Sequence, residues 1–181
     1  IIDFIENLAK NTQNYIKNSE KIEELPLIYQ DDMLAYQTRT RSYIKIQDGC
    51  NNFCSYCIIP YLRGRSRSRD VSSIIEEAKM LGEDVKEIVL TGINVTDYKI
   101  DGEAGLLTLL QNLNRLGKRL RLSSMEETLV SEDFIRGLSE LKNFCPHFHL
   151  SLQSGSNTVL KRMNRHYSAE DFEMSVRLIR K

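Results

Sequence analysis

The sequence predicts an α/β fold: the first four βα units of a partial (βα) barrel. From residue 43 onward, short β-prone runs alternate with helical patterns in strand–helix order. The spacing leaves room for one helix after each run, with extra loop after the first. One face of most runs is polar, which suits a curved parallel sheet with outer helices and a polar concave side. An antiparallel α+β sheet with one solvated face accounts for the same alternation.

Three of the four expected strands alternate apolar and polar side chains. In the third run, Leu120 and Leu122 alternate with Arg119, Arg121 and Ser123. The runs are SYIKIQ (42–47), EIVLTG (87–92), RLRLSS (119–124) and HFHLSLQS (147–154).

Four amphipathic helical stripes follow these strands. Their apolar positions are Ile74, Ile75, Ala78 and Leu81; Leu106, Leu109, Leu110, Leu113 and Leu116; Phe134, Ile135, Leu138 and Leu141; and Phe172, Val176 and Ile179. The expected caps are Ser73 with Glu76, Gly117 at a C-terminus, Ser131, and Ser168 with Asp171.

The amino-terminal part has a different character. Residues 1–18 carry a helical apolar stripe, and residues 19–42 are polar, with Pro26 and little periodicity. We therefore expect a helical connector and linker over residues 1–42 and one domain over residues 43–181. The missing initiator Met and the abrupt end at Lys181 predict a piece of a longer protein.

Composition excludes several classes of protein. The chain has 181 residues and zero formal net charge, so no global field favours a polyanion or a membrane surface. Four cysteines, no signal peptide and no apolar run long enough to span a bilayer predict a cytoplasmic, reducing setting. Clustered cysteines there usually hold metal.

Three cysteines in one short loop form the most specific motif. Cys50, Cys54 and Cys57 follow the first strand with C-x₃-C-x₂-C spacing. Three thiolates suit an iron–sulfur cube with one iron left open for a small molecule. A zinc knuckle completed by Cys145 or a histidine is the alternative, in which the chain is a non-catalytic RNA-binding module. Cys145 itself is expected to be an ordinary half-buried cysteine.

The motifs together resemble the radical S-adenosylmethionine (SAM) methylthiotransferase family, and most of all its branch that acts on threonylcarbamoyladenosine beside the tRNA anticodon. The resemblance rests on GCNNFCSYCIIPYLRGRSRSR (49–69), LTGIN (90–94), RLRLSSME (119–126) and CPHFHLSLQSGSNTVLKRMNRHY (145–167). It implies a radical SAM type of barrel and an enzyme that adds a methylthio group to that nucleoside. Another modified adenosine or a ribosomal protein is the alternative substrate within the family.

The resemblance also implies which residues bind the cofactors. Cys50, Cys54 and Cys57 are the expected ligands of a [4Fe–4S] cluster, whose open iron binds SAM. The residues expected to surround SAM are Phe53, Tyr56, Gly92, Asn94, Ser124, Glu126, Ser151 and Gln153. Alternatively, Phe53 or Tyr56 packs the loop and Asn94 caps a helix. The three histidines, His147, His149 and His166, are read as hydrogen-bonding residues, with a catalytic role considered for His149.

A basic segment follows the cysteines. Arg63, Arg65, Arg67 and Arg69 alternate at period two, so an extended chain aligns them on one edge for contacts with tRNA phosphates. Alternatively, some pair with carboxylates or with the carboxylate of SAM. A second basic run, Lys161, Arg162 and Arg165, either extends this surface or lies on a solvated helix face.

The resemblance implies parts that the chain lacks. No cysteine precedes Cys50, so a second cluster is expected on an absent upstream domain. An electron donor is needed, and the chain alone is expected to be inactive. Glu127 stands where relatives usually have Pro, which puts the local turn in doubt.

Overall fold

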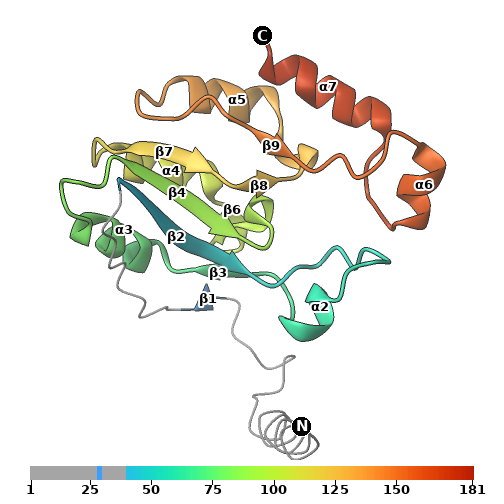
Figure 1. Cartoon of the computed structure of the whole chain (residues 1–181), viewed down its shortest axis with the longest axis horizontal. Helices are drawn as coiled ribbons and strands as arrows, with labels where there is room; N and C mark the ends of the chain where they lie inside the picture. Colours follow the sequence, from blue (N-terminus) through green and yellow to red (C-terminus); the bar gives the residue numbers. More distant parts are fainter. Residues whose placement is uncertain (1–27, 30–39) are drawn as a thin grey trace, which may run out of the picture.

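A five-stranded mixed sheet forms the centre of the computed structural model, which describes residues 28–29 and 40–181. Its order is β1-β3-β2-β4-β7, and β2, β4 and β7 run parallel (Figure 1). The strands are β1 (Ile28–Tyr29), β2 (Arg41–Asp48), β3 (Arg67–Arg69), β4 (Glu87–Gly92) and β7 (Arg119–Leu122). β3 runs antiparallel to β2 and parallel to β1. The α/β prediction is confirmed. The antiparallel alternative is wrong for β2, β4 and β7, which correspond to three of the four expected strands.

The fourth predicted strand is much shorter than expected. Of residues 147–154, only β9 (His149–Leu150) is a strand, and it pairs in parallel with β8 (Ser124–Met125). Before β9, Phe144 forms a single parallel bridge with Leu120 of β7. The sequence HFHLSLQS alternates well enough for a strand, but alternation does not supply a partner for each backbone group. A small hairpin, β5 (Lys99–Ile100) and β6 (Glu103–Ala104), completes the strands.

The predicted helices form with small differences at their ends. They are α3 (Val71–Met80), α4 (Leu106–Asn114), α5 (Glu132–Ser139) and α7 (Ala169–Ile179); two short helices, α2 (Ile59–Leu62) and α6 (Asn157–Arg162), were not predicted. Two 3₁₀ turns, η2 (Val95–Asp97) and η3 (Glu127–Leu129), follow β4 and β8. Ser131 caps α5, and Ser168 with Asp171 forms the expected capping box.

The cap of α3 is a correction. Asp70, rather than Ser73 with Glu76, is the N-cap, and its carboxylate accepts a hydrogen bond from the Ser73 backbone N–H at 3.0 Å. Any Asp, Ser, Thr or Asn near a helix start satisfies the same free backbone groups. The expected Gly117 lies beyond the end of α4 with φ of +73°, as a left-handed position after a helix requires.

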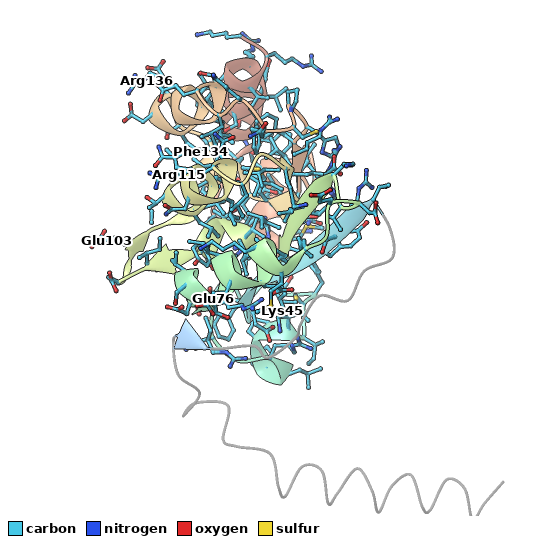
Figure 2. The ribbon with its side chains drawn as sticks, turned by 90° about the vertical axis from the view of Figure 1, so that its left-hand side faces the viewer. Lys45, Glu76, Glu103, Arg115, Phe134 and Arg136 are labelled. Atoms are coloured by element: carbon cyan, nitrogen blue, oxygen red, sulfur yellow. The ribbon has the colours of Figure 1, made fainter. Side chains whose placement is uncertain are left out.

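The core lies between the apolar face of the sheet and the helices. Ile44, Ile46, Leu120 and Leu122 on the strands are fully buried or nearly so. They belong to one cluster with helical residues such as Ile74, Leu109, Leu110, Leu113 and Phe134. Figure 2 shows Phe134 inside the helical layer, whereas Arg115 and Arg136 point outward. None of the helices in residues 40–181 is both long and apolar enough to cross a membrane.

The opposite face of the sheet carries charged side chains, and these side chains are paired with one another. The Glu87 carboxylate forms ion pairs with Arg41 at 2.6 Å, Arg121 at 3.0 Å and Arg119 at 3.3 Å. Hydrogen bonding from Arg121, with the charges of the other two arginines, lowers the pKa of Glu87 although burial opposes the shift. Arg119 and Arg121 alternate with the core residues Leu120 and Leu122, as the sequence predicts.

The helix expected over residues 1–18 lies outside the described residues, as does most of the expected linker. Within that linker, β1 pairs with β3 and so belongs to the sheet.

Candidate functional site

The cysteine loop begins where β2 ends and is held against the segment that leads into β3. Gly49 adopts φ of +70°, and the Cys50 backbone N–H donates to the Gly64 carbonyl at 3.1 Å. Asp48, at the last position of β2, accepts hydrogen bonds from Arg63 and Lys45. Burial opposes ionisation of Asp48, but these cationic donors lower its pKa. The loop is therefore fixed at its root by a buried ionised carboxylate.

One cavity of about 370 Å³ lies beside this loop, at the carboxyl ends of the parallel strands. In Figure 1 the arrowheads of β2 and β4 point toward the side of the molecule where the cysteine loop and α6 lie. The predicted site residues that line it are Cys50, Cys54, Tyr56, Cys57, Gly92, Asn94, Ser124, Glu126, Ser151 and Gln153. Catalytic and cofactor-binding groups of parallel α/β folds gather at this end of the sheet.

Gln47 supports the wall that β4 contributes. Its side-chain oxygen accepts from the Asn94 backbone N–H at 2.8 Å, and its amide donates to the carbonyls of Asp48 and Gly49. A Cβ atom on Gly92 would lie only 2.9 Å from the Gln47 carbonyl oxygen, so glycine is needed for this close approach. Asn94 caps η2 through the Thr96 backbone N–H, which was the alternative considered for it, and it also lines the cavity.

Glu126 is the centre of a polar network in the cavity. Its carboxylate accepts from Asn52 at 2.7 Å, from Arg165 at 2.6 Å and from Asn94 at 3.5 Å. Its backbone N–H donates to the Thr96 hydroxyl at 2.9 Å. The network ties the cysteine loop, the β4 turn and the segment after α6 to one carboxylate.

The β8–β9 pair supplies the remaining wall. The Ser124 hydroxyl lies 3.1 Å from Nδ1 of His149, which fits the hydrogen-bonding role expected for that histidine. The Tyr167 hydroxyl donates to the carbonyls of Ser151 and Leu152 at 2.7 and 2.6 Å. Gln153 adopts φ of +63°, a left-handed conformation that turns the chain away from the strand.

Phe53 is placed differently from the prediction. It lies outside the cavity, with its ring edge-on to Tyr61 at 5.6 Å and below the Arg65 guanidinium at 4.6 Å. Its own φ of +48° turns the side chain to the outer side of the loop. Phe53 therefore packs the loop, which was the alternative considered for it.

The four arginines do not share one exposed edge. Arg69 is 3% exposed and bonds Glu77, the Ser73 hydroxyl and the Lys45 carbonyl, so the expectation of phosphate contact is wrong for it. Arg63 and Arg67 both reach Asp48, at 3.1 and 3.4 Å. Arg65 is exposed over Phe53. Pairing with carboxylates, the alternative reading, holds for Arg63, Arg67 and Arg69.

Arg165 is the functional residue whose place the sequence reasoning missed. The sequence predicts a basic surface or a solvated helix face for Arg165, yet its side chain is only 6% exposed and lines the cavity. Lys161 and Arg162, by contrast, are exposed. Arg165 lies in RMNRHY (162–167), within the motif at 145–167 that carries the family resemblance, and this was the signal that could have placed it at the site. The other lining residues not predicted are Asn52, Ile59, Ile93 and Met125.

The three thiols of the cysteine loop gather at one cavity. Cys50 and Cys54 are buried and Cys57 is half-buried, and all three line the same cavity. Burial, with the nearby acids Asp97 and Glu126, raises the pKa of the Cys50 thiol. No group of three or more His, Cys, Asp or Glu side chains in residues 40–181 surrounds a point for one metal ion. In a cube each thiolate binds a different iron, so convergence on one point is not required.

Cys145 cannot complete a knuckle with these thiols. It is 2% exposed, more buried than predicted, and its backbone N–H donates to the carbonyl of Leu120 near the start of β7. Arg119, the first residue of β7, donates to its sulfur at 3.0 Å. Cys145 thus lies at the end of β7 opposite to the cavity, and this zinc alternative is wrong.

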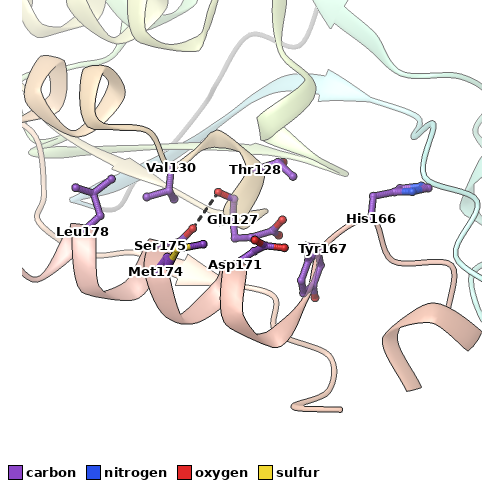
Figure 3. A pocket seen from close by; sticks show the side chains of 9 residues that line it. All are labelled: Glu127, Thr128, Val130, His166, Tyr167, Asp171, Met174, Ser175 and Leu178. Atoms are coloured by element: carbon purple, nitrogen blue, oxygen red, sulfur yellow. Dashed lines mark hydrogen bonds between the residues drawn. The ribbon is translucent and has the colours of Figure 1, made fainter. Parts of the chain in front are cut away.

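Glu127 faces a separate pocket of about 350 Å³, next to Asp171, Tyr167 and His166 (Figure 3). Its side chain is buried, and Oε2 has no hydrogen-bond partner within the part of the chain described. Burial, with the charge of Glu126, raises the pKa of Glu127. The turn that was in doubt forms as η3, and its Glu127 carbonyl accepts from the Val130 N–H at 2.8 Å.

Comparison with known proteins adds the family. The model of the radical SAM superfamily matches residues 44–181. Threonylcarbamoyladenosine tRNA methylthiotransferase MtaB of Chlamydia pneumoniae is 43% identical over 87% of this chain, and that of Aquifex aeolicus 36% over 95%. The tRNA-2-methylthio-N(6)-dimethylallyladenosine synthase of Clostridium novyi is 37% identical over 99%. The chain covers 39%, 44% and 40% of these relatives. The resemblance drawn from the motifs is confirmed.

Solved structures agree on the fold. The cobalamin-dependent S-adenosylmethionine radical enzyme OxsB with aqua-cobalamin bound matches with a TM-score of 0.62 and 12% identity, over 76% of this chain and 22% of that protein. The apo form of the same enzyme matches with a TM-score of 0.60. At this identity the likeness concerns the fold alone.

Proposed function

Because the chain belongs to the radical SAM superfamily, we propose that it is part of an enzyme that transfers a methylthio group to threonylcarbamoyladenosine in tRNA. One observation carries the proposal: three cysteine thiols and a ring of polar groups from β4, β8 and β9 line a single cavity. The superfamily implies SAM and a [4Fe–4S] cluster as cofactors.

Within this proposal the chain's own residues hold and shield the cofactors. Cys50, Cys54 and Cys57 are the thiolates for the cluster, and the loop that carries them is fixed by Asp48 and Gly64. When bound there, the cluster would supply the electron, and SAM the 5′-deoxyadenosyl group, for hydrogen removal from the substrate. The protein positions these groups and keeps water away from them.

The polar wall suits the zwitterionic and ribose parts of SAM. Asn94 and Ser124 offer hydrogen-bond donors and acceptors, and Glu126 offers a carboxylate held by Asn52 and Arg165. Tyr56 is more than half exposed at the rim, where a flat ring can cover an adenine. These assignments follow from which side chains line the cavity.

The experiment that tests the proposed function must distinguish two candidate substrates. Relatives named for threonylcarbamoyladenosine and a relative named for dimethylallyladenosine share similar identity with this chain. We favour the first because the motif strings resemble that branch. Deleting the gene should abolish methylthiolated threonylcarbamoyladenosine in tRNA hydrolysates while methylthiolated dimethylallyladenosine persists; the reverse pattern would assign the second substrate.

The cofactor part of the proposal has its own measurement. Anaerobically prepared and reconstituted chain should contain about four iron and four sulfide per chain. Cys54→Ala should lose most of this iron, whereas Cys145→Ala, a matched buried cysteine outside the cavity, should keep it. One zinc per chain, or equal iron in both variants, would refute the cluster assignment.

The chain spans about two fifths of its curated relatives, so we propose that turnover needs the rest of the protein. The second cluster expected on an upstream domain and an electron donor belong to this part of the proposal. Methylthio product formed from tRNA by this chain alone would contradict it.

A further inference from the structure

The turn that follows α6, residues 163–167, is tied to the cysteine loop. The Ser55 backbone N–H donates to the Met163 carbonyl at 3.1 Å. The Asn164 side-chain amide donates to the carbonyls of Asn52 and Phe53 at 3.0 and 3.1 Å. Asn164 itself adopts φ of +56°, a conformation that asparagine tolerates better than most residues. The turn therefore fixes the backbone on both sides of Cys54.

Arg165 extends from this turn into the cavity and reaches the sulfur itself. Its Nη1 donates to Cys54 Sγ at 3.2 Å, and its Nη2 donates to Glu126 Oε1 at 2.6 Å. Its guanidinium carbon lies over the Tyr167 ring, 5.0 Å from the ring centre. Its Nε is buried without a partner among the described residues, so one donor remains for an acceptor in the cavity.

A buried guanidinium is costly unless its charge is compensated. Glu126 provides one negative charge, and a thiolate at Cys54 provides a second close to the same cation. Removing Arg165 would leave the Glu126 carboxylate and the thiolate facing each other without a cation between them. The position therefore matters most when negative charge accumulates on the sulfur.

We propose that Arg165 is a positioning residue that sets the reduction potential of the cluster held by Cys54. Reduction adds one negative charge to the cluster, and a cationic hydrogen-bond donor at a ligand sulfur stabilises the more negative state. Arg165 therefore makes the cluster easier to reduce, and Glu126 partly offsets this effect. The inference rests on the proposed function, because it assumes an iron–sulfur cluster at these cysteines.

The test is the midpoint potential of the reconstituted chain, titrated anaerobically and followed by the spectrum of the reduced cluster. Arg165→Met keeps most of the side-chain volume and removes the charge and the donors. At a fixed applied potential its reduced-to-oxidised ratio should fall at least tenfold, a downward shift of about 59 mV for one electron. Arg165→Lys should lie between the two, and Arg162→Met, an exposed position on α6, should match the unchanged chain.

A second variant keeps the test decisive if Arg165→Met loses its cluster. Glu126→Gln retains the arginine and removes the opposing negative charge, so the potential should rise. Equal midpoint potentials for Arg165→Met and Arg162→Met at equal iron content would overturn the role of Arg165. A lower midpoint potential in Glu126→Gln would overturn it as well. Neither result would refute the proposed function. Unchanged chain that takes up no iron and sulfide would instead refute the proposed function, and with it this inference.

Discussion

Replacing Gly49 by alanine should release the cysteine loop from the sheet. Gly49 has φ of +70°, where an L-residue costs about 1–2 kcal/mol. A Cβ atom there would lie 2.0 Å from the Arg65 carbonyl oxygen and 2.8 Å from that of Gly64, both rigid backbone atoms. The two segments must separate, which breaks the 3.1 Å hydrogen bond from Cys50 to Gly64, worth about 1 kcal/mol, and adds about 1–3 kcal/mol of overpacking.

Gly117 provides the matched control. Its φ of +73° is nearly the same, but nothing lies within 4 Å of a Cβ added there. Gly117→Ala should therefore lose only the conformational cost of about 1–2 kcal/mol, whereas Gly49→Ala should lose about 3–6 kcal/mol in total. At a slope of about 2 kcal/mol per M, Gly49→Ala should lower the urea midpoint by at least ~1.5 M, which is about 1 M or more beyond the shift of Gly117→Ala. Gly49→Ala should also take up less iron on reconstitution. Identical urea midpoints for the two variants would show that the close approach contributes nothing.

Three further outcomes follow from burial and pairing. Arg69→Leu leaves the buried Glu77 carboxylate without its cation and should lower the free energy of unfolding by about 3–5 kcal/mol. Arg65→Leu, at an exposed position, should change it by less than ~1 kcal/mol. Comparable urea midpoints for the two variants would contradict the buried pair. Under the proposed function, Arg65→Ala in the whole protein should weaken tRNA binding and reduce the slope of log affinity against log salt concentration by about 1, and an unchanged slope would exclude Arg65 from phosphate contact. Glu127→Gln should stabilise the chain at pH 8, because burial raises the pKa of Glu127 and its ionisation costs stability as pH rises through that pKa. This gain should vanish below the ordinary pKa of about 4.5, while Glu132→Gln should show no such gain; thermal unfolding at both pH values decides.

Glu126 also explains why charge reversal in this cavity would be hard to tolerate. It accepts hydrogen bonds from three different segments, and Asp97 lies close enough for the charge of Glu126 to contribute to the raised pKa of Asp97, after burial. In the lining of the cavity, Glu126 and Arg165 form one ion pair. Asp97 lines the neighbouring pocket, and its Oδ2 has no hydrogen-bond partner among the described residues.

Features that depend on neighbours along the chain can be predicted from the order of the amino acids. The spacing of Cys50, Cys54 and Cys57, the alternation in β7 and the caps at Ser131 and Ser168 were all readable because each involves residues a few positions apart. The strand predicted over residues 87–92 matches β4. Even the cavity wall was largely predictable, because the ends of parallel strands meet at one edge of a sheet.

The partner of each polar side chain, by contrast, depends on how distant segments pack in three dimensions. Arg165 meets Cys54 across 111 positions of the chain, and Arg69 turns into the core beside Glu77 while Arg65 stays outside. Periodicity assigns a residue to a face, but it does not say which distant segment packs on that face. For the same reason the run at 147–154 shows strand alternation yet forms only β9, because a strand requires a neighbour for its backbone as well as a suitable pattern.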